Sequence, residues 1–135
     1  MPLMGRIIVP LKIENANDSR ASLQCDALVD TGASYLVLPI AWKSRLGELR
    51  ATRNVELELA DQSNLSGEIC GPVLIQIEGF PPIYNEVLFI DMKPKNGTYE
   101  VLLGYIILEQ SQAAVDMVGH RLVYVKQMDL KSVIP

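Results

Sequence analysis

The chain has 135 residues, of which 49 % are hydrophobic and 21 % are charged, and its formal net charge is −4. This length fits one domain, and this composition is typical of a folded protein rather than a disordered one. Because Lys and Arg form no basic stripe, a phosphate-binding surface is excluded and we expect no nucleic-acid partner. No apolar run approaches the roughly 18–20 residues that span a bilayer, so we expect no membrane partner either.

The first part of the chain predicts short strands. Val, Ile and Leu occur there in short runs separated by turn-forming residues, a texture that favours strands over long helices. Residues 7–13 and 22–29 predict a hairpin across a turn rich in Asn and Asp. A short strand over residues 35–39 follows, and residues 40–46 predict one short helix that ends at Gly47.

The middle of the chain predicts a second hairpin, over residues 55–70. Its first arm alternates apolar and charged residues, which is typical of a half-exposed strand. Strands are expected over residues 73–77 and 86–90, with a loop over residues 93–97.

The last part of the chain predicts a brief strand over residues 101–103 and a helix of about two turns over residues 105–112. Residues 113–117 and 122–125 then flank a hairpin turn around Gly119.

The two halves of the sequence have a similar order of elements. Each half opens on Gly, runs through strand, turn and strand, and ends on an apolar pair that leads to Gly32 or Gly104. No linker separates the halves, so we expect an internal pseudo-repeat within a single domain over residues 1–135. Its core is expected over residues 7–125, with a C-terminal tail over residues 126–135.

An aspartate at the end of a predicted core strand is the first candidate for chemistry. Asp30 follows the apolar residues 27–29, so its carboxylate is expected at the edge of the hydrophobic interior. Gly32 allows a close backbone approach, and Thr31 offers a hydroxyl for local hydrogen bonds. Asp-Thr-Gly is also an ordinary turn at a strand end, so the tripeptide alone leaves a structural role open.

Around this motif the sequence resembles the retropepsin-like aspartic proteases. Residues 28–33 match their apolar strand with Asp-Thr-Gly-Ala, and residues 102–108 match a later apolar pair and Gly that lead into a helix. The hairpin over residues 55–70 occupies the position of the flap that closes over substrate, and residues 114–125 suit the returning strands. The resemblance implies an all-β fold with one or two short helices, a closed barrel with one half-site per chain. Within this family, the chain resembles the stand-alone proteases of prokaryotes more than it resembles a segment of a viral polyprotein.

The resemblance also implies an activity. Retropepsin-like proteases are endopeptidases in which two aspartates share a proton and activate a water. With one Asp-Thr-Gly per chain, Asp30 must meet its own copy in a homodimer that takes a peptide or protein substrate. No cofactor and no metal are expected. The implied site residues are Asp30 as the catalytic group; Thr31, Gly32 and Ala33 as its support; Ala60, Asp61, Gln62, Ser63 and Asn64 as flap residues against substrate; and Leu102, Leu103 and Gly104 as the second-half glycine motif.

Two positions depart from the viral members of the family. The viral enzymes have an arginine after the second glycine and an acidic residue two positions after the first, and the two side chains pair to steady the dimer. This chain has Tyr105 and Ser34 at those positions, so no such ion pair can form.

Other candidates for chemistry have weaker support. His120 lies in a Gly-His turn without a nearby nucleophile motif. Asp91 and Asp116 could each supply a second carboxylate, but no Thr-Gly follows either of them. Cys25 and Cys70 are expected to be buried free thiols, and the default compartment is a reducing cytoplasm.

Two alternatives to the protease remain open. One is a non-catalytic peptide-binding or dimerisation module on the same fold, because a fold does not prove a function. The other is a monomer whose activity needs a larger partner.

Overall fold

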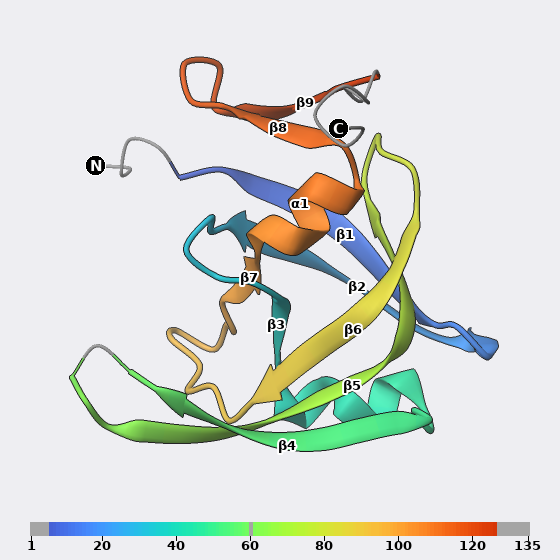
Figure 1. The fold of residues 1–135 in the computed structure, drawn as a ribbon, viewed down its shortest axis with the longest axis vertical. Helices are drawn as coiled ribbons and strands as arrows, with labels where there is room; N and C mark the ends of the chain where they lie inside the picture. Colours follow the sequence, from blue (N-terminus) through green and yellow to red (C-terminus); the bar gives the residue numbers. More distant parts are fainter. Residues whose placement is uncertain (1–5, 60, 127–135) are drawn as a thin grey trace, which may run out of the picture.

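The computed structural model describes residues 6–59 and 61–126. Within them the chain is mostly β-structure with two short helices, as the sequence predicts (Figure 1). The elements are β1 (Ile8–Asn15), β2 (Asp18–Val29), β3 (Leu36–Pro39), the 3₁₀ helix η1 (Ile40–Leu46), β4 (Ala51–Glu58), β5 (Asn64–Ile77), β6 (Ile83–Ile90), β7 (Val101–Leu103), α1 (Tyr105–Gln110), β8 (Ala113–Asp116) and β9 (Arg121–Tyr124).

A closed barrel forms the centre of the molecule. The main sheet has the order β1-β2-β7-β3-β6-β5-β4, and an additional pairing of β1 with β5 closes it into a ring that leaves out β4. In this closing pair Leu11 lies opposite Ile77, and Ile13 lies opposite Ile75. All four of these side chains are buried, so the alternation of apolar residues along β1 and β5 sets which face points into the barrel.

The core of the barrel consists of aliphatic side chains, one phenylalanine and the thiol of Cys70. Phe89 is its largest member and is fully buried. A second, smaller cluster lies around Val37, Ile69 and Leu88, and half-buried residues of β4 pack against it. The sheet therefore has apolar contacts on both of its faces in this region.

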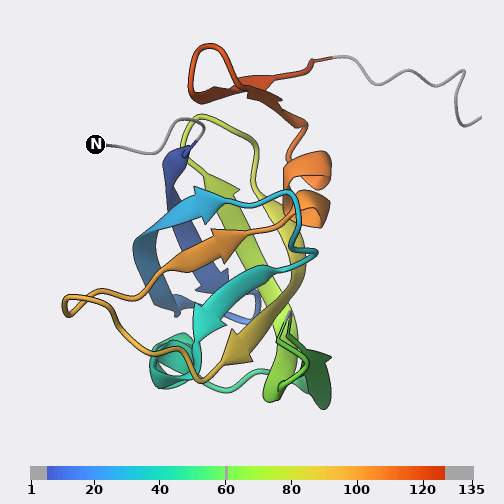
Figure 2. The same ribbon diagram turned by 90° about the vertical axis from the view of Figure 1, so that its left-hand side faces the viewer.

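The two halves of the chain have the same arrangement of strands, which confirms the expected internal pseudo-repeat. β2 runs parallel to β7, and β6 runs parallel to β3. β3 and β7 then pair with each other in antiparallel fashion. As Figure 2 shows, β7 lies between β2 and β3, although β2 and β3 are consecutive in the chain. The loop between β2 and β3, which begins at Asp30, must therefore cross the end of β7.

The hairpin of β4 and β5 is longer than the sequence predicts. Its paired residues extend over residues 51–71, with Ala51 opposite Gly71, and it runs along the lower part of Figure 1. Residues 51–54 are exposed and have no apolar alternation, so only their pairing with β5 makes them a strand. β5 also continues through Pro72, because its register against β6 shifts between Cys70 and Val73 and proline is tolerated at such irregularities.

The C-terminal part lies against one end of the barrel. α1 is shorter than predicted and ends at Gln110, and β8 and β9 form a separate two-stranded sheet (Figure 1). Nine residues of the predicted tail, 127–135, lie outside the described part of the chain. No helix within the described part is long and apolar enough to cross a membrane.

Candidate active site

Asp30 directly follows the last residue of β2. Its backbone N–H donates to the carbonyl of Leu103 at 3.0 Å, which continues the parallel ladder between β2 and β7 by one step. Its carboxylate Oδ1 accepts from the N–H of Gly32 at 3.0 Å, and its carbonyl accepts from the N–H of Ala33 at 3.1 Å. These bonds hold Asp30 in a tight turn, with the carboxylate half-buried and its second oxygen available for another partner.

The alternation of side chains along β2 places Asp30 on the outer face of the barrel. Ala27 and Val29 belong to the core cluster inside the barrel. Leu28 and Asp30 therefore project from the opposite face, because successive side chains of a strand point to opposite sides. Leu102 of β7 lies beside Leu28 in the parallel register and contacts the outer apolar cluster.

Gly104 directly follows β7, just as Asp30 directly follows β2. The structure requires glycine at position 104. A Cβ at this position would lie 2.5 Å from the carbonyl carbon of Ser34 and 2.6 Å from its oxygen. No side chain fits at such distances, so the crossing of the β2–β3 loop over β7 depends on this residue. At Gly32 the constraint is milder, because an added Cβ would lie 3.2 Å from Oδ1 of Asp30.

Backbone hydrogen bonds join the Asp30 loop to the start of α1. The N–H of Tyr105 donates to the carbonyl of Ala33 at 2.8 Å, and the N–H of Ile106 donates to the carbonyl of Ser34 at 3.2 Å. Tyr105 and Ser34 are the positions at which the viral enzymes have an arginine and an acidic residue. Within one chain the loop and the helix are thus held together without that ion pair.

A groove opens on the face of the barrel that carries Leu28 and Leu102. It has a volume of about 410 Å³ and an apolar floor. Asp30 is not among the residues that line the groove, but Leu28 is, and Leu28 precedes Asp30 by two residues and so shares its face of the barrel wall. The residues that line it are Arg6, Ile8, Leu28, Ile90, Met92, Lys93, Lys95, Thr98, Tyr99, Glu100, Val101 and Leu102.

The expected flap corresponds to the outer part of the β4–β5 hairpin. Val55 and Leu57 of β4 pack against the cluster that contains Leu102, whereas Glu56 and Glu58 are exposed on the other face of the strand. Asp61 near the turn accepts hydrogen bonds from the hydroxyl of Ser63 at 2.5 Å and from its backbone N–H at 3.0 Å.

These bonds fix the outer turn of the hairpin. They lower the pKa of the Asp61 carboxyl below its usual value, with the hydroxyl of Ser63 as the main cause. Of the other expected flap residues, Gln62, Ser63 and Asn64 are exposed, and Ala60 lies outside the described residues.

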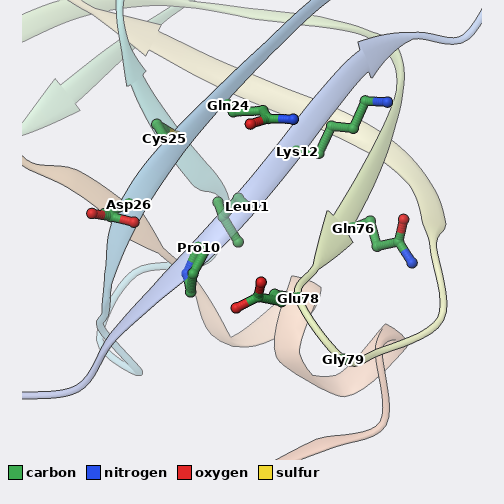
Figure 3. A pocket seen from close by; sticks show the side chains of 9 residues that line it. All are labelled: Pro10, Leu11, Lys12, Gln24, Cys25, Asp26, Gln76, Glu78 and Gly79. Atoms are coloured by element: carbon green, nitrogen blue, oxygen red, sulfur yellow. The ribbon is translucent and has the colours of Figure 1, made fainter.

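Another concavity, of about 560 Å³, lies elsewhere on the barrel wall and is shown in Figure 3. Its side chains come from β1, from β2 and from the end of β5, and Asp30 is not among them. Cys25 contributes to this wall and is half-buried, less than the sequence predicts. Burial, with a smaller effect of Asp26, raises the pKa of its thiol to about 11, so this cysteine is unsuited to act as a nucleophile.

The other candidate groups have structural partners. The carboxylate of Asp116 accepts from the N–H of Gly119 at 2.9 Å and pairs with Arg121 at 3.1 Å, and His120 adopts a positive φ in the same turn. Asp91 lies 3.7 Å from Lys93 in an exposed ion pair. Residues 6–59 and 61–126 contain no group of three or more His, Cys, Asp and Glu side chains that could hold a metal ion.

The closed barrel with a strand between β2 and β3, the flap-like hairpin and the late helix are together the retropepsin fold. A solved structure described as EIAV protease complexed with the inhibitor HBY-793 matches this chain with a TM-score of 0.57. The two chains are 24 % identical, and the match covers 82 % of this chain and 91 % of that chain. A likeness at this level of identity shows the fold alone. No protein-family model matches the chain, and no curated protein matches it.

The sequence pointed to Asp30 and the two glycines but not to the groove beside them. Leu28 could have been found, because it precedes Asp30 by two residues and so shares its face of the strand. Ile90, Met92 and Tyr99 have no local signal of this kind. Only the strand order β2-β7-β3-β6, which places Ile90, and the path of residues 91–100 bring them to Leu28.

Proposed function

We propose that this protein is an aspartic endopeptidase whose active site forms where two copies of the chain meet, with one Asp30 from each. The observation that carries the proposal is the turn at Asp30. Its carboxylate lies at the end of a core strand, keeps one oxygen free, and projects from the same face as Leu28, which lines an apolar groove. The retropepsin fold of the chain supports the same reading.

The chemistry follows from bringing two carboxylates together. Two such groups at contact distance in a shielded site cannot both ionise, so they share one proton and titrate as a pair. The ionised carboxylate takes a proton from a water molecule between them, and the protonated one donates a hydrogen bond to the peptide carbonyl. The water oxygen bonds to the carbonyl carbon, and the C–N bond then breaks as the carboxyl that took the proton from the water passes it to the leaving nitrogen. Thr31 and Gly32 support the turn, and the β4–β5 hairpin closes over an extended peptide.

The dimer is part of the proposal, because one chain supplies only one Asp-Thr-Gly. The stand-alone, prokaryotic character of the protein and its cytoplasmic location are proposals too. The state of the two cysteines fits a reducing compartment, since both are free thiols in the described structure.

The test compares the wild-type chain with Asp30→Asn on casein and on a peptide library between pH 4 and 7. We expect the variant to lose cleavage while light scattering still finds it dimeric. Cleavage by both forms at the same rate would contradict the proposal. Equal peptide binding by both forms without any cleavage would support a non-catalytic binding module instead.

A further inference from the structure

The groove beside Asp30 has an apolar floor and a predominantly basic rim. Leu28, Leu102 and Ile90 form part of the floor. The charged residues that line the groove are three cations and one carboxylate, namely Arg6, Lys93, Lys95 and Glu100. The whole chain carries a net charge of −4, so this rim has the opposite sign to the rest of the molecule.

The three cations differ in how far their charge is already neutralised. Arg6 pairs with Glu100 at 3.0 Å. Lys93 lies 3.7 Å from Asp91, and both side chains are largely exposed, so water screens this pair and it contributes little. Lys95 has no carboxylate within 4.0 Å among the residues that the structure describes. Its ammonium group is the rim charge most available to a ligand.

The backbone around Lys95 is well defined. Lys95 and Thr98 exchange two backbone hydrogen bonds, of 2.9 and 3.0 Å, across Asn96 and Gly97. Both central residues have positive φ, which is the geometry of a tight two-residue turn and the reason for Asn-Gly here. The turn therefore gives the backbone at Lys95 a defined local conformation, and residues on both sides of it line the same groove.

The acidic residues of the hairpin do not oppose this charge. Glu56 and Glu58 lie on the exposed face of β4, opposite to the face on which Val55 and Leu57 pack towards Leu102. The concavity of Figure 3 has the reverse character, because Asp26 and Glu78 there outnumber Lys12. A preference for negative ligands is thus a property of the groove beside Asp30 and not of the barrel surface in general.

We infer that Lys95 is a specificity-determining residue that selects an acidic side chain in the peptide. The inference rests on the proposed function and concerns its substrate class. An apolar side chain enters the groove over Leu28 and Leu102. An Asp or Glu two positions away in the peptide then lies on the same face of the extended backbone and reaches the rim at Lys95.

The experiment uses three sets of peptides that differ only at this position, with Glu, Gln or Lys two residues from an apolar residue. We expect the wild-type protein to cleave the Glu peptides with a kcat/KM about five-fold higher than the Lys peptides at low salt. Lys95→Glu should reverse this order. Lys12→Glu makes the same change of charge in the concavity of Figure 3 and should keep the wild-type order. The preference should fade in about 1 M salt, where charges are screened within about 3 Å.

Binding to Asp30→Asn, followed by fluorescence anisotropy with the same peptides, separates this inference from the proposed function. If Asp30→Asn binds the Glu peptides more tightly and the wild type cleaves none of the peptides, the inference about Lys95 holds and the proposed endopeptidase activity is wrong. If the wild type and Lys95→Glu both cleave the peptides with the same ranking of kcat/KM, the inference about Lys95 is wrong and the proposed endopeptidase activity holds. Absence of both cleavage and peptide binding would overturn both.

Discussion

At the scale of single residues, a few polar groups hold the barrel together where its strands end. Asn15 is the clearest example, because its side chain is buried at the end of β1. Its Nδ2 donates to the carbonyls of Leu46 and Glu48, both at 2.8 Å, and its Oδ1 accepts from the N–H of Asn17. One amide thus links the first hairpin to the end of η1. The sequence predicts only a turn here, since the partners are some thirty residues away.

We expect Asn15→Ala to lower the free energy of unfolding by about 2 kcal/mol, because it leaves two carbonyls without their donors. Urea denaturation of the purified protein measures this change. Asn17→Ala is the matched control, since the Asn17 side chain is exposed, and it should change stability by less than about 0.5 kcal/mol. Equal effects of the two substitutions would show that the Asn15 amide contributes nothing specific.

At the scale of elements, the junction of β7 with α1 decides the shape of the site. The β2–β3 loop crosses the end of β7 so closely that Gly104 leaves no room for a side chain. The glycine of the expected Leu-Leu-Gly pattern is therefore a packing requirement, because the backbone carbonyls of Tyr35 and Ser34 lie where a side chain would be.

Gly104→Ala should destabilise the protein by about 3 kcal/mol or prevent its folding, because either the loop or α1 must move. Thermal unfolding measures the loss. The reference is Ala114→Gly, which also changes one methyl group but lies in β8, outside the site. Gly119→Ala cannot serve as the reference, because a Cβ at Gly119 would also meet side-chain atoms. A Gly104→Ala protein with wild-type stability would refute the packing requirement.

One carboxylate links the two ends of the β8–β9 turn. The N–H of Gly119 donates to Asp116 and Arg121 pairs with it, and these contacts hold the pKa of the Asp116 carboxyl below its ordinary value of 3.8. A carboxyl whose pKa is lower in the folded state stabilises the fold above its unfolded pKa, and this contribution is lost as the pH falls through the folded pKa.

The difference in unfolding free energy between the wild type and Asp116→Asn should therefore be greatest near neutral pH and shrink below pH 3.8. Chemical denaturation at a series of pH values gives this difference directly. A gap between the two proteins that stays constant from neutral pH into the acid range would contradict the assigned role of the ionised carboxylate.

At the scale of the whole molecule, local patterns predict most elements but not how they join. The hydrophobic alternation predicts strands, Asp-Thr-Gly predicts the turn at Asp30, and Leu-Leu-Gly predicts the start of the late helix. The closing contact between β1 and β5, the extension of β4 to Ala51 and the continuity of β5 through Pro72 depend on partner strands far away in the sequence. The groove beside Asp30 depends on the same long-range pairing, so local patterns do not predict it.

The central claim is that one active site needs Asp30 from two chains, and mixing the two forms of the protein tests it most directly. Asp30→Asn is added to a fixed amount of wild-type protein under conditions in which subunits exchange, and the rate of peptide cleavage is followed. If mixed dimers are inactive, an equimolar amount of the variant lowers the rate to about one half, and more variant lowers it further. A rate that stays constant at every ratio would show that each chain works alone and would contradict the claim.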